Sequence, residues 1–77
     1  MPKAFVLISV EVAREKEVAQ KLRELEGVSE VYEVYGSYDI IAVVEADSLE
    51  KLREIVFSRI RRTEGIRSTT TFVTAVT

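Results

Sequence analysis

The chain has 77 residues, a net charge of −2 and a sequence pI of about 5.1, which predicts one small domain with no general attraction for nucleic acid or an anionic membrane. It contains no cysteine and no histidine, which excludes disulfides and argues against a transition-metal site. A domain of this size buries only about 60% of the surface of its unfolded chain. Because disulfides and metals are not available, we expect it to gain stability by oligomerisation.

No apolar stretch approaches the roughly 20 residues of a membrane span, so the sequence predicts a soluble, cytoplasmic protein. Charged residues make up 31% of the chain and asparagine is absent, a composition that resembles that of thermophile proteins.

The first part of the chain is predicted to form a strand and then a helix. Residues 4–12 alternate between two faces, both of them apolar in the first half of the strand. Residues 15–26 then change to helical spacing, and Gly27 provides a natural C-terminal stop. The apolar stripe of this helix consists of Val18, Ala19, Leu22 and Leu25.

A hairpin occupies the middle of the chain. Residues 28–34 and 40–46 read as two apolar strands, and Gly36–Ser37 between them is the Gly-X pair of a two-residue type II′ turn. The turn brings Tyr35, Tyr38 and the carboxylate of Asp39 to one edge of the sheet. Loops held by rigid strands commonly carry function, so we expect a small ligand to bind here.

The last part of the chain repeats the helix-and-strand pattern. Asp47 to Glu50 reads as a capping box, with Asp47 as the N-cap of a helix over residues 49–60, and Gly65 follows that helix. Residues 66–76 form the last predicted strand, which is rich in threonine.

The predicted order is therefore β-α-β-β-α-β in a single domain over residues 1–77. Two right-handed crossovers joined by a hairpin give a ferredoxin-like α+β sandwich, with two helices on one face of a four-stranded antiparallel sheet. The third strand is apolar on both faces, through Ile40 and Ala42 on one and Ile41 and Val43 on the other. Since the second face of such a sheet normally meets water, we expect dimers to form between open sheet faces.

Catalysis is not expected. The chain lacks the cysteines of metal carriers and iron–sulfur ferredoxins, and it lacks the histidines that activate nucleophiles. It also lacks the asparagine of an acylphosphatase-like site and the stacking aromatic residues of an RNA-binding sheet. We therefore predict no metal and no cofactor. The basic run Arg59–Arg62 is most simply read as cations at a helix C-terminus, with nucleic-acid contact as the alternative.

Two groups of polar residues have both a structural and a functional interpretation. Asp39 either stabilises the turn through nearby amides or binds a ligand. Thr69 and Thr71 share one strand face, where they serve β-propensity or offer hydroxyls to an ammonium or a carboxylate.

Three stretches of the chain together resemble the effector-binding (RAM) domain of the Lrp/AsnC transcription regulators: Val31–Ile41, Asp47–Leu49 and Gly65–Thr71. The family pattern Gly-x-Tyr-Asp is matched by Gly36–Asp39. The later pattern Gly-Val-x-x-Thr-x-Thr is matched within Gly65–Thr71, where isoleucine replaces valine. The resemblance covers nearly all of the chain.

The resemblance implies dimers through open sheet faces and often a ring of four dimers, with a free amino acid bound between subunits near the hairpin. Backbone amides around Gly36 would hold its carboxylate, and Asp39 with the threonine hydroxyls would hold its polar groups. The ligand-binding residues implied in this way are Tyr35, Gly36, Ser37, Tyr38, Asp39, Thr69 and Thr71. Because the first strand begins at residue 4, we expect a stand-alone version without the family's helix-turn-helix.

The sequence thus predicts an amino-acid sensing and oligomerisation module for transcriptional regulation of amino-acid metabolism. A first alternative is a ligand-free assembly partner of full-length Lrp/AsnC regulators. A second is an ACT-like regulatory domain, although the Gly-rich turn usual after its first strand is absent. An enzyme ranks last.

Overall fold

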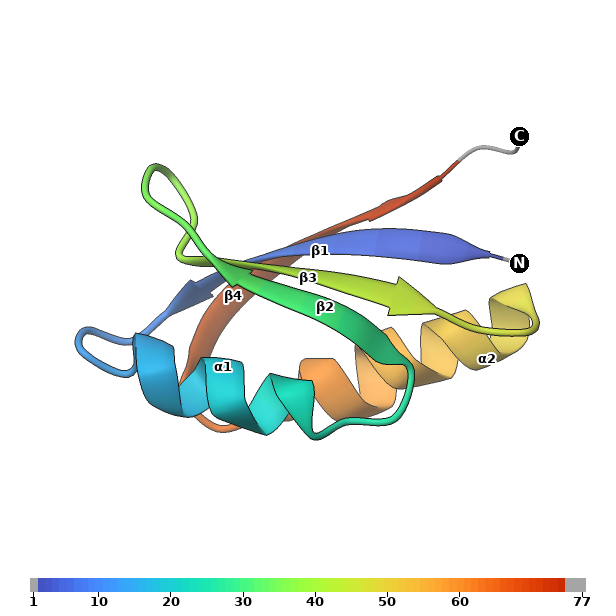
Figure 1. Ribbon diagram of the computed structural model, residues 1–77, viewed down its shortest axis with the longest axis horizontal. Coiled ribbons are helices and arrows are strands. Elements are labelled where there is room, and N and C mark those ends of the chain that lie inside the picture. The colour runs from blue at the N-terminus through green and yellow to red at the C-terminus, as the bar shows by residue number, and fades with distance from the viewer. Residues whose placement is uncertain (1, 75–77) are drawn as a thin grey trace.

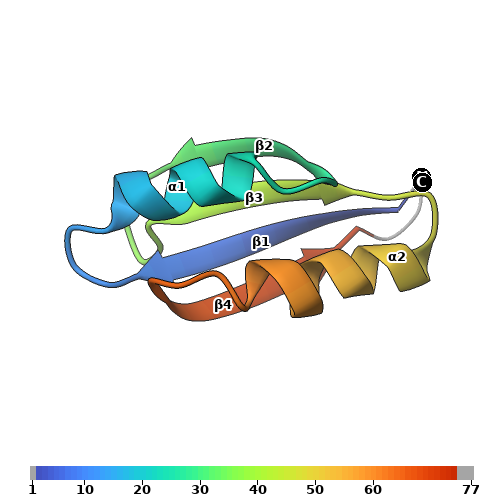
Figure 2. The same ribbon diagram turned by 90° about the horizontal axis from the view of Figure 1, so that it is seen from below.

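The computed structural model describes residues 2–74, which form a four-stranded sheet. The helices cover one face of this sheet (Figures 1 and 2). The elements in chain order are β1 (Lys3–Val10), α1 (Glu15–Arg23), β2 (Val28–Glu33), β3 (Ile40–Glu45), α2 (Leu49–Glu54), the π-helical segment η1 (Ile55–Ile60) and β4 (Ile66–Val73). The sheet order is β2-β3-β1-β4, and each pair of neighbours is antiparallel. The predicted ferredoxin-like βαββαβ fold is confirmed.

The core lies between the sheet and the helices, as the apolar periodicity predicts. Alternate side chains of β1 and β3 pack against the apolar side chains of two helical faces, one on α1 and one on α2 and η1. These side chains are Ala4, Val6, Ile8, Val10, Ile40, Ala42, Val44, Val18, Ala19, Leu22, Leu52, Ile55, Val56 and Ile60. Burial of each larger aliphatic side chain contributes about 1.5–3 kcal/mol, so this layer is the main source of stability.

The first strand and the first helix both end earlier than predicted. β1 stops at Val10, and Val12 is 87% exposed in the loop that follows. The strand ends there because the Glu11 amide donates to the Gly65 carbonyl oxygen at 2.9 Å and the chain then turns through a positive φ at Ala13. α1 ends at Arg23 instead of residue 26, and Gly27 lies in the following turn with φ +95°. A Cβ at Gly27 would overlap the side chain of Ile55, so glycine permits the close approach of this turn to η1.

The second helix begins with a different cap from the predicted one. Ser48, not Asp47, is the N-cap: its hydroxyl accepts the Lys51 amide at 3.1 Å, while Asp47 lies exposed one residue earlier. The predicted helix over residues 49–60 is continuous but widens at its second half, where the Arg61 amide donates to the Val56 carbonyl oxygen at 3.1 Å. The predicted capping box is therefore wrong: with Ser48 as the N-cap, the residue three positions later is Lys51, which has no carboxylate to accept the amide of the cap residue.

β2, β3 and β4 end within a few residues of the predicted limits. β2 ends at Glu33 and β3 at Glu45, one residue before the predicted ends. β4 ends at Val73, three residues before the predicted end, and residues 75 and 76 of the predicted strand lie outside the described residues. Within residues 2–74, no helix is long and apolar enough to cross a membrane.

Candidate ligand-binding site

The loop between β2 and β3 is wider than the predicted two-residue turn. It comprises the six residues 34–39, and the Val34 amide closes it by donating to the Asp39 carbonyl oxygen at 2.9 Å. The Asp39 amide does not complete a tight turn but donates to the Ile8 carbonyl oxygen of β1 at 2.9 Å. Gly36 has φ +127°, a conformation that favours glycine. The turn prediction was therefore right about the glycine and wrong about the size of the loop.

The side chain of Asp39 fastens this loop to the end of β1. Its Oδ2 accepts the Val10 amide at 2.9 Å in a partly buried position. Val10 lies where the register between β1 and β4 shifts, so its amide needs a partner from outside the regular ladder. The structural interpretation of Asp39 is thus supported, although the amide comes from another strand and not from the turn. Within residues 2–74, Oδ1 makes no hydrogen bond and remains available to a ligand.

A cavity of about 270 Å³ lies beside the loop. Its lining residues are Glu15, Lys16, Glu33, Val34, Tyr35 and Asp39. Three carboxylates and one ammonium therefore surround an opening that also has an apolar and an aromatic wall. Glu15 and Lys16, at the start of α1, were missed by the sequence analysis. The signal was topological: β1 and β3 are antiparallel, so the loop that leaves β1 and the loop that enters β3 lie at the same end of the sheet.

The remaining predicted site residues do not meet at this cavity within one protomer. The hydroxyls of Tyr38 and Thr70 are 3.2 Å apart, so the loop contacts β4 through the threonine between the two predicted ones. Thr69 and Thr71 pair with the buried residues Ile8 and Val6 and therefore point to the helix side of the sheet.

Those two threonines line two other hollows, Thr69 beside Arg67 and Thr71 beside α2 and η1. Gly36 and Ser37 are exposed at the tip of the loop. Of the seven predicted residues, Tyr35 and Asp39 line the cavity beside the loop.

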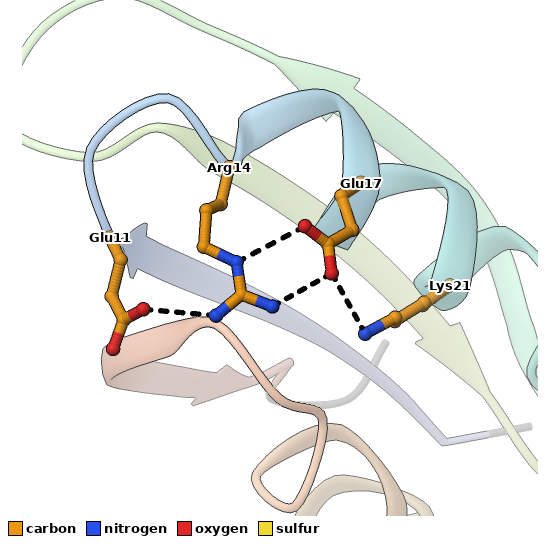
Figure 3. Close-up of polar contacts among 4 residues, drawn as sticks. All are labelled: Glu11, Arg14, Glu17 and Lys21. Carbon is orange, nitrogen blue, oxygen red and sulfur yellow. Dashed lines mark hydrogen bonds and ion pairs between the residues drawn. The ribbon is translucent and has the colours of Figure 1, made fainter.

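An ion-pair network spans the connection from β1 to α1 and the start of α1 (Figure 3). The guanidinium of Arg14 donates to Glu11 at 3.0 Å and to Glu17 at 2.7 Å, and the ammonium of Lys21 donates to Glu17 at 3.2 Å. These donors, Arg14 foremost, lower the pKa of Glu17 to about 2. All four side chains are solvent-accessible, so salt screens this network and its contribution to stability is modest.

The open face of the sheet carries an apolar surface. Phe5 of β1 lies between Val43 of β3 and Phe72 of β4 in the strand register. Phe5 and Phe72 are exposed, as is Tyr32 on β2, whereas Val43 is buried even without a cover. This is the doubly apolar character predicted for β3, extended over the neighbouring strands. Exposed apolar patches of this kind are typical of interaction surfaces in general.

Comparison with known proteins identifies the family of this domain. A family model described as the Lrp/AsnC ligand binding domain matches residues 3–76. An uncharacterized HTH-type transcriptional regulator of Pyrococcus furiosus, PF0250, is 38% identical over 77 residues, which cover 96% of this chain and 51% of that protein. The chain thus spans about half the length of the curated regulators that it matches.

Solved structures agree with this assignment. The hypothetical protein PHS023 from Pyrococcus horikoshii superposes with a TM-score of 0.92 at 36% identity, covering 100% of this chain and 93% of that one. TTHA0845 from Thermus thermophilus gives a TM-score of 0.92 at 35% identity, with 100% and 96% covered.

Two further relatives bear on function. A feast or famine regulatory protein of M. tuberculosis, Rv3291c, solved in complex with L-methionine, is 26% identical, with a TM-score of 0.78 over 100% of this chain and 52% of that one. A homocitrate synthase of Saccharolobus islandicus is 44% identical over 54 residues, which are 70% of this chain but only 12% of the enzyme. The likeness to the enzyme is therefore confined to a small part of it. With its βαββαβ fold and a family match that spans almost all of its residues, this chain belongs to the Lrp/AsnC ligand-binding domain family.

Proposed function

We propose that this domain is an amino-acid sensing and oligomerisation module in the transcriptional regulation of amino-acid metabolism. Binding of a free amino acid would be coupled to the association of subunits. The observation that carries the proposal is the cavity beside the hairpin loop, because its lining has the chemistry of a zwitterion site. The family and the L-methionine bound to the M. tuberculosis relative support the same class of ligand. The cytoplasm, where free amino acids and transcription meet, is the proposed location.

The cavity offers a partner for each part of an amino acid. Asp39 and Glu33 would accept the α-ammonium, and Lys16 would donate to the α-carboxylate. Val34 and Tyr35 would contact the ligand side chain. A charge-assisted hydrogen bond contributes about 1.5–3 kcal/mol, so two such bonds suit a reversible effector site.

A second subunit would complete the site. Thr69 and Thr71 lie away from the cavity of their own protomer. In a homodimer, or in an octamer built from four dimers, the threonine hydroxyls of a neighbouring subunit would reach the ligand in this cavity. The apolar open face of the sheet would form the dimer.

DNA recognition would come from a separate DNA-binding unit. The elements described within residues 2–74 all belong to the βαββαβ fold, and the chain has a negative net charge, which does not favour DNA binding. In a gel-shift assay at physiological salt, we expect this domain to show no DNA binding at sub-micromolar concentration. We do expect it to co-purify with a full-length Lrp/AsnC regulator. Sub-micromolar binding with a steep salt dependence would contradict this expectation.

A thermal-shift screen of the twenty amino acids tests the proposal. A ligand at 100 times its Kd stabilises the folded protein by about 2.7 kcal/mol, which corresponds to a rise in Tm on the order of 10 °C. Asp39→Asn should keep the fold and lose most of that rise, because it removes the charge but keeps an acceptor oxygen for Val10. Asp47→Asn is the matched control, since Asp47 is an exposed carboxylate away from the cavity. A full ligand-induced rise in Asp39→Asn would remove the proposed role of Asp39.

The second candidate function is a ligand-free assembly partner of full-length regulators. It is favoured by the hydrogen bond from the Val10 amide, which gives the Asp39 carboxylate a role without a ligand. It predicts that none of the twenty amino acids raises the Tm while co-purification with a regulator persists.

A further inference from the structure

A hollow of opposite charge to the cavity beside the hairpin loop lies between the end of η1 and the start of β4. Its volume is about 330 Å³. This is at the lower end of the range for small-molecule sites, roughly 300–1,000 Å³. The residues that line it are Arg61, Ile66, Arg67, Ser68 and Thr69. This lining contains two guanidiniums and no carboxylate, so the hollow favours an anion.

Both guanidiniums keep their charge available. Arg59, at the start of the basic run, pairs with Glu26 at 3.8 Å. Arg61 and Arg67, by contrast, take part in no ion pair within residues 2–74. A guanidinium presents its N–H donors as a planar fork that matches the oxygens of a phosphate group.

The ring of Phe57 holds the first guanidinium. The guanidinium carbon of Arg61 lies 5.2 Å from the centre of that ring. Such a contact occupies one face of the guanidinium and leaves the N–H groups at its edge free to donate. Arg61 is thus restrained beside the hollow before any ligand binds.

A bulge in β4 places the second guanidinium. Ser68 pairs with Ser9, and the next pair along the strands is Ile66 with Val10. Arg67 lies between these pairs without an opposite residue in β1. Bulges often redirect a side chain beside a functional site. Since β4 is an edge strand, the amides on its outer side also lack a partner strand and can donate to an anion.

We propose that this hollow binds a phosphate group, either as free phosphate or as part of a small molecule, and is a second ligand site apart from the amino-acid cavity. Arg61 and Arg67 hold the phosphate oxygens, and the hydroxyl of Ser68 donates to one of them. The hydroxyl of Thr69 is not required.

Two other classes of ligand fit this hollow poorly. A free amino acid finds no carboxylate in the lining for its ammonium group. A nucleic acid presents a row of phosphates, whereas two guanidiniums in one hollow match a single phosphate group, and the chain has a net charge of −2. The site stands whether or not an amino acid binds beside Asp39.

Equilibrium dialysis of the whole chain against radiolabelled inorganic phosphate tests the site, with sodium chloride keeping the ionic strength constant. Binding to wild type should saturate at one phosphate per chain. Arg61→Gln and Arg67→Gln should each weaken it at least about 10-fold, as expected for loss of a charge-assisted hydrogen bond. Arg62→Gln is the matched control, because it removes an exposed arginine that does not line the hollow, and it should bind like wild type.

Competition identifies the source of the phosphate group. If adenosine monophosphate displaces the label at a lower concentration than unlabelled phosphate does, the hollow binds a phosphate-bearing small molecule. If it needs an equal or higher concentration, the hollow binds free phosphate. Displacement by duplex DNA at a lower phosphate concentration than either would overturn the proposal, because the arginines would then form a nucleic-acid surface.

Thermal shifts with amino acids in the same variants allow the two proposals to fail separately. Asp39→Asn should keep phosphate binding, and Arg61→Gln and Arg67→Gln should keep any rise in Tm that an amino acid gives wild type. Both arginines are exposed, and these unfolding curves also show that each variant is folded. If phosphate saturates but no amino acid raises the Tm, only the sensing proposal fails.

Three results would contradict the phosphate site. The first is that phosphate does not saturate on wild type at constant ionic strength. The second is that Arg62→Gln weakens binding as much as Arg67→Gln, which would indicate a diffuse attraction. The third is that Arg67→Gln abolishes the amino-acid response together with phosphate binding, which would indicate one shared site.

Discussion

Replacement of Asp39 by alanine is expected to destabilise the domain through the end of β1. The change removes the acceptor of the Val10 amide, a hydrogen bond of 2.9 Å in a partly buried position. An amide left without a partner in such a position costs about 1–3 kcal/mol. For a domain of 77 residues, 1 kcal/mol corresponds to about 4–8 °C in Tm, so Asp39→Ala should lower the Tm by roughly 5–20 °C.

Urea unfolding at one fixed protein concentration measures this cost, since the apparent stability of an oligomer depends on concentration. Asp39→Asn keeps an oxygen that can accept the Val10 amide and should stay within about 1 kcal/mol of wild type. Asp47→Ala, at an exposed carboxylate, should stay within about 0.5 kcal/mol. If Asp39→Ala also unfolds within about 0.5 kcal/mol of wild type, the Val10 amide is satisfied by water, and Asp39 does not hold the loop to β1.

Three further predictions concern assembly, backbone and charge. Light scattering across a dilution series should show no 8.7 kDa species at micromolar concentration, and Phe72→Ser on the open sheet face should favour dissociation; a micromolar wild-type monomer contradicts this. In urea unfolding, Gly65→Ala should lower the free energy of unfolding more than Gly36→Ala does. Both glycines have a positive φ, but only a Cβ at Gly65 would meet neighbouring side chains, the nearest atom at 2.8 Å. Equal losses would refute this reasoning. Because hydrogen bonds, chiefly from Arg14, hold the pKa of Glu17 at about 2, below its usual 4.5, its stabilising effect should be complete above pH 4.5 and lost toward pH 2. An NMR titration of Glu17 checks this prediction, and a midpoint near 4.5 would disprove it.

Periodicity in the sequence was sufficient to predict the fold. The alternation in β1 and the helical spacing of Val18, Ala19 and Leu22 both correspond to buried positions, and the apolar run from Ile40 identified a strand that is apolar on both faces. These patterns are local, and each element buries the face that its own spacing defines.

Features that depend on distant segments were predicted less well. The loop around Gly36 is wide because the Asp39 backbone bonds β1, which no residue of the loop indicates. Lys16 lies in the cavity because the chain topology brings α1 beside the hairpin. The cap moved from Asp47 to Ser48, because both residue types are good N-caps and the sequence does not fix the first helical residue.

The end of β1 has a consequence for the order in which the domain opens. Ile8 and Val10 hold the hairpin loop through Asp39, and the amide of Glu11 holds the turn before β4 through Gly65. Three connections that are distant in sequence thus share one strand terminus. Their amides should lose protection from hydrogen exchange together, as one cooperative unit, because opening any one of these connections removes the support of the other two. An effector bound beside Asp39 would then slow exchange of the Glu11 amide, which bonds the turn before β4, without contacting that turn.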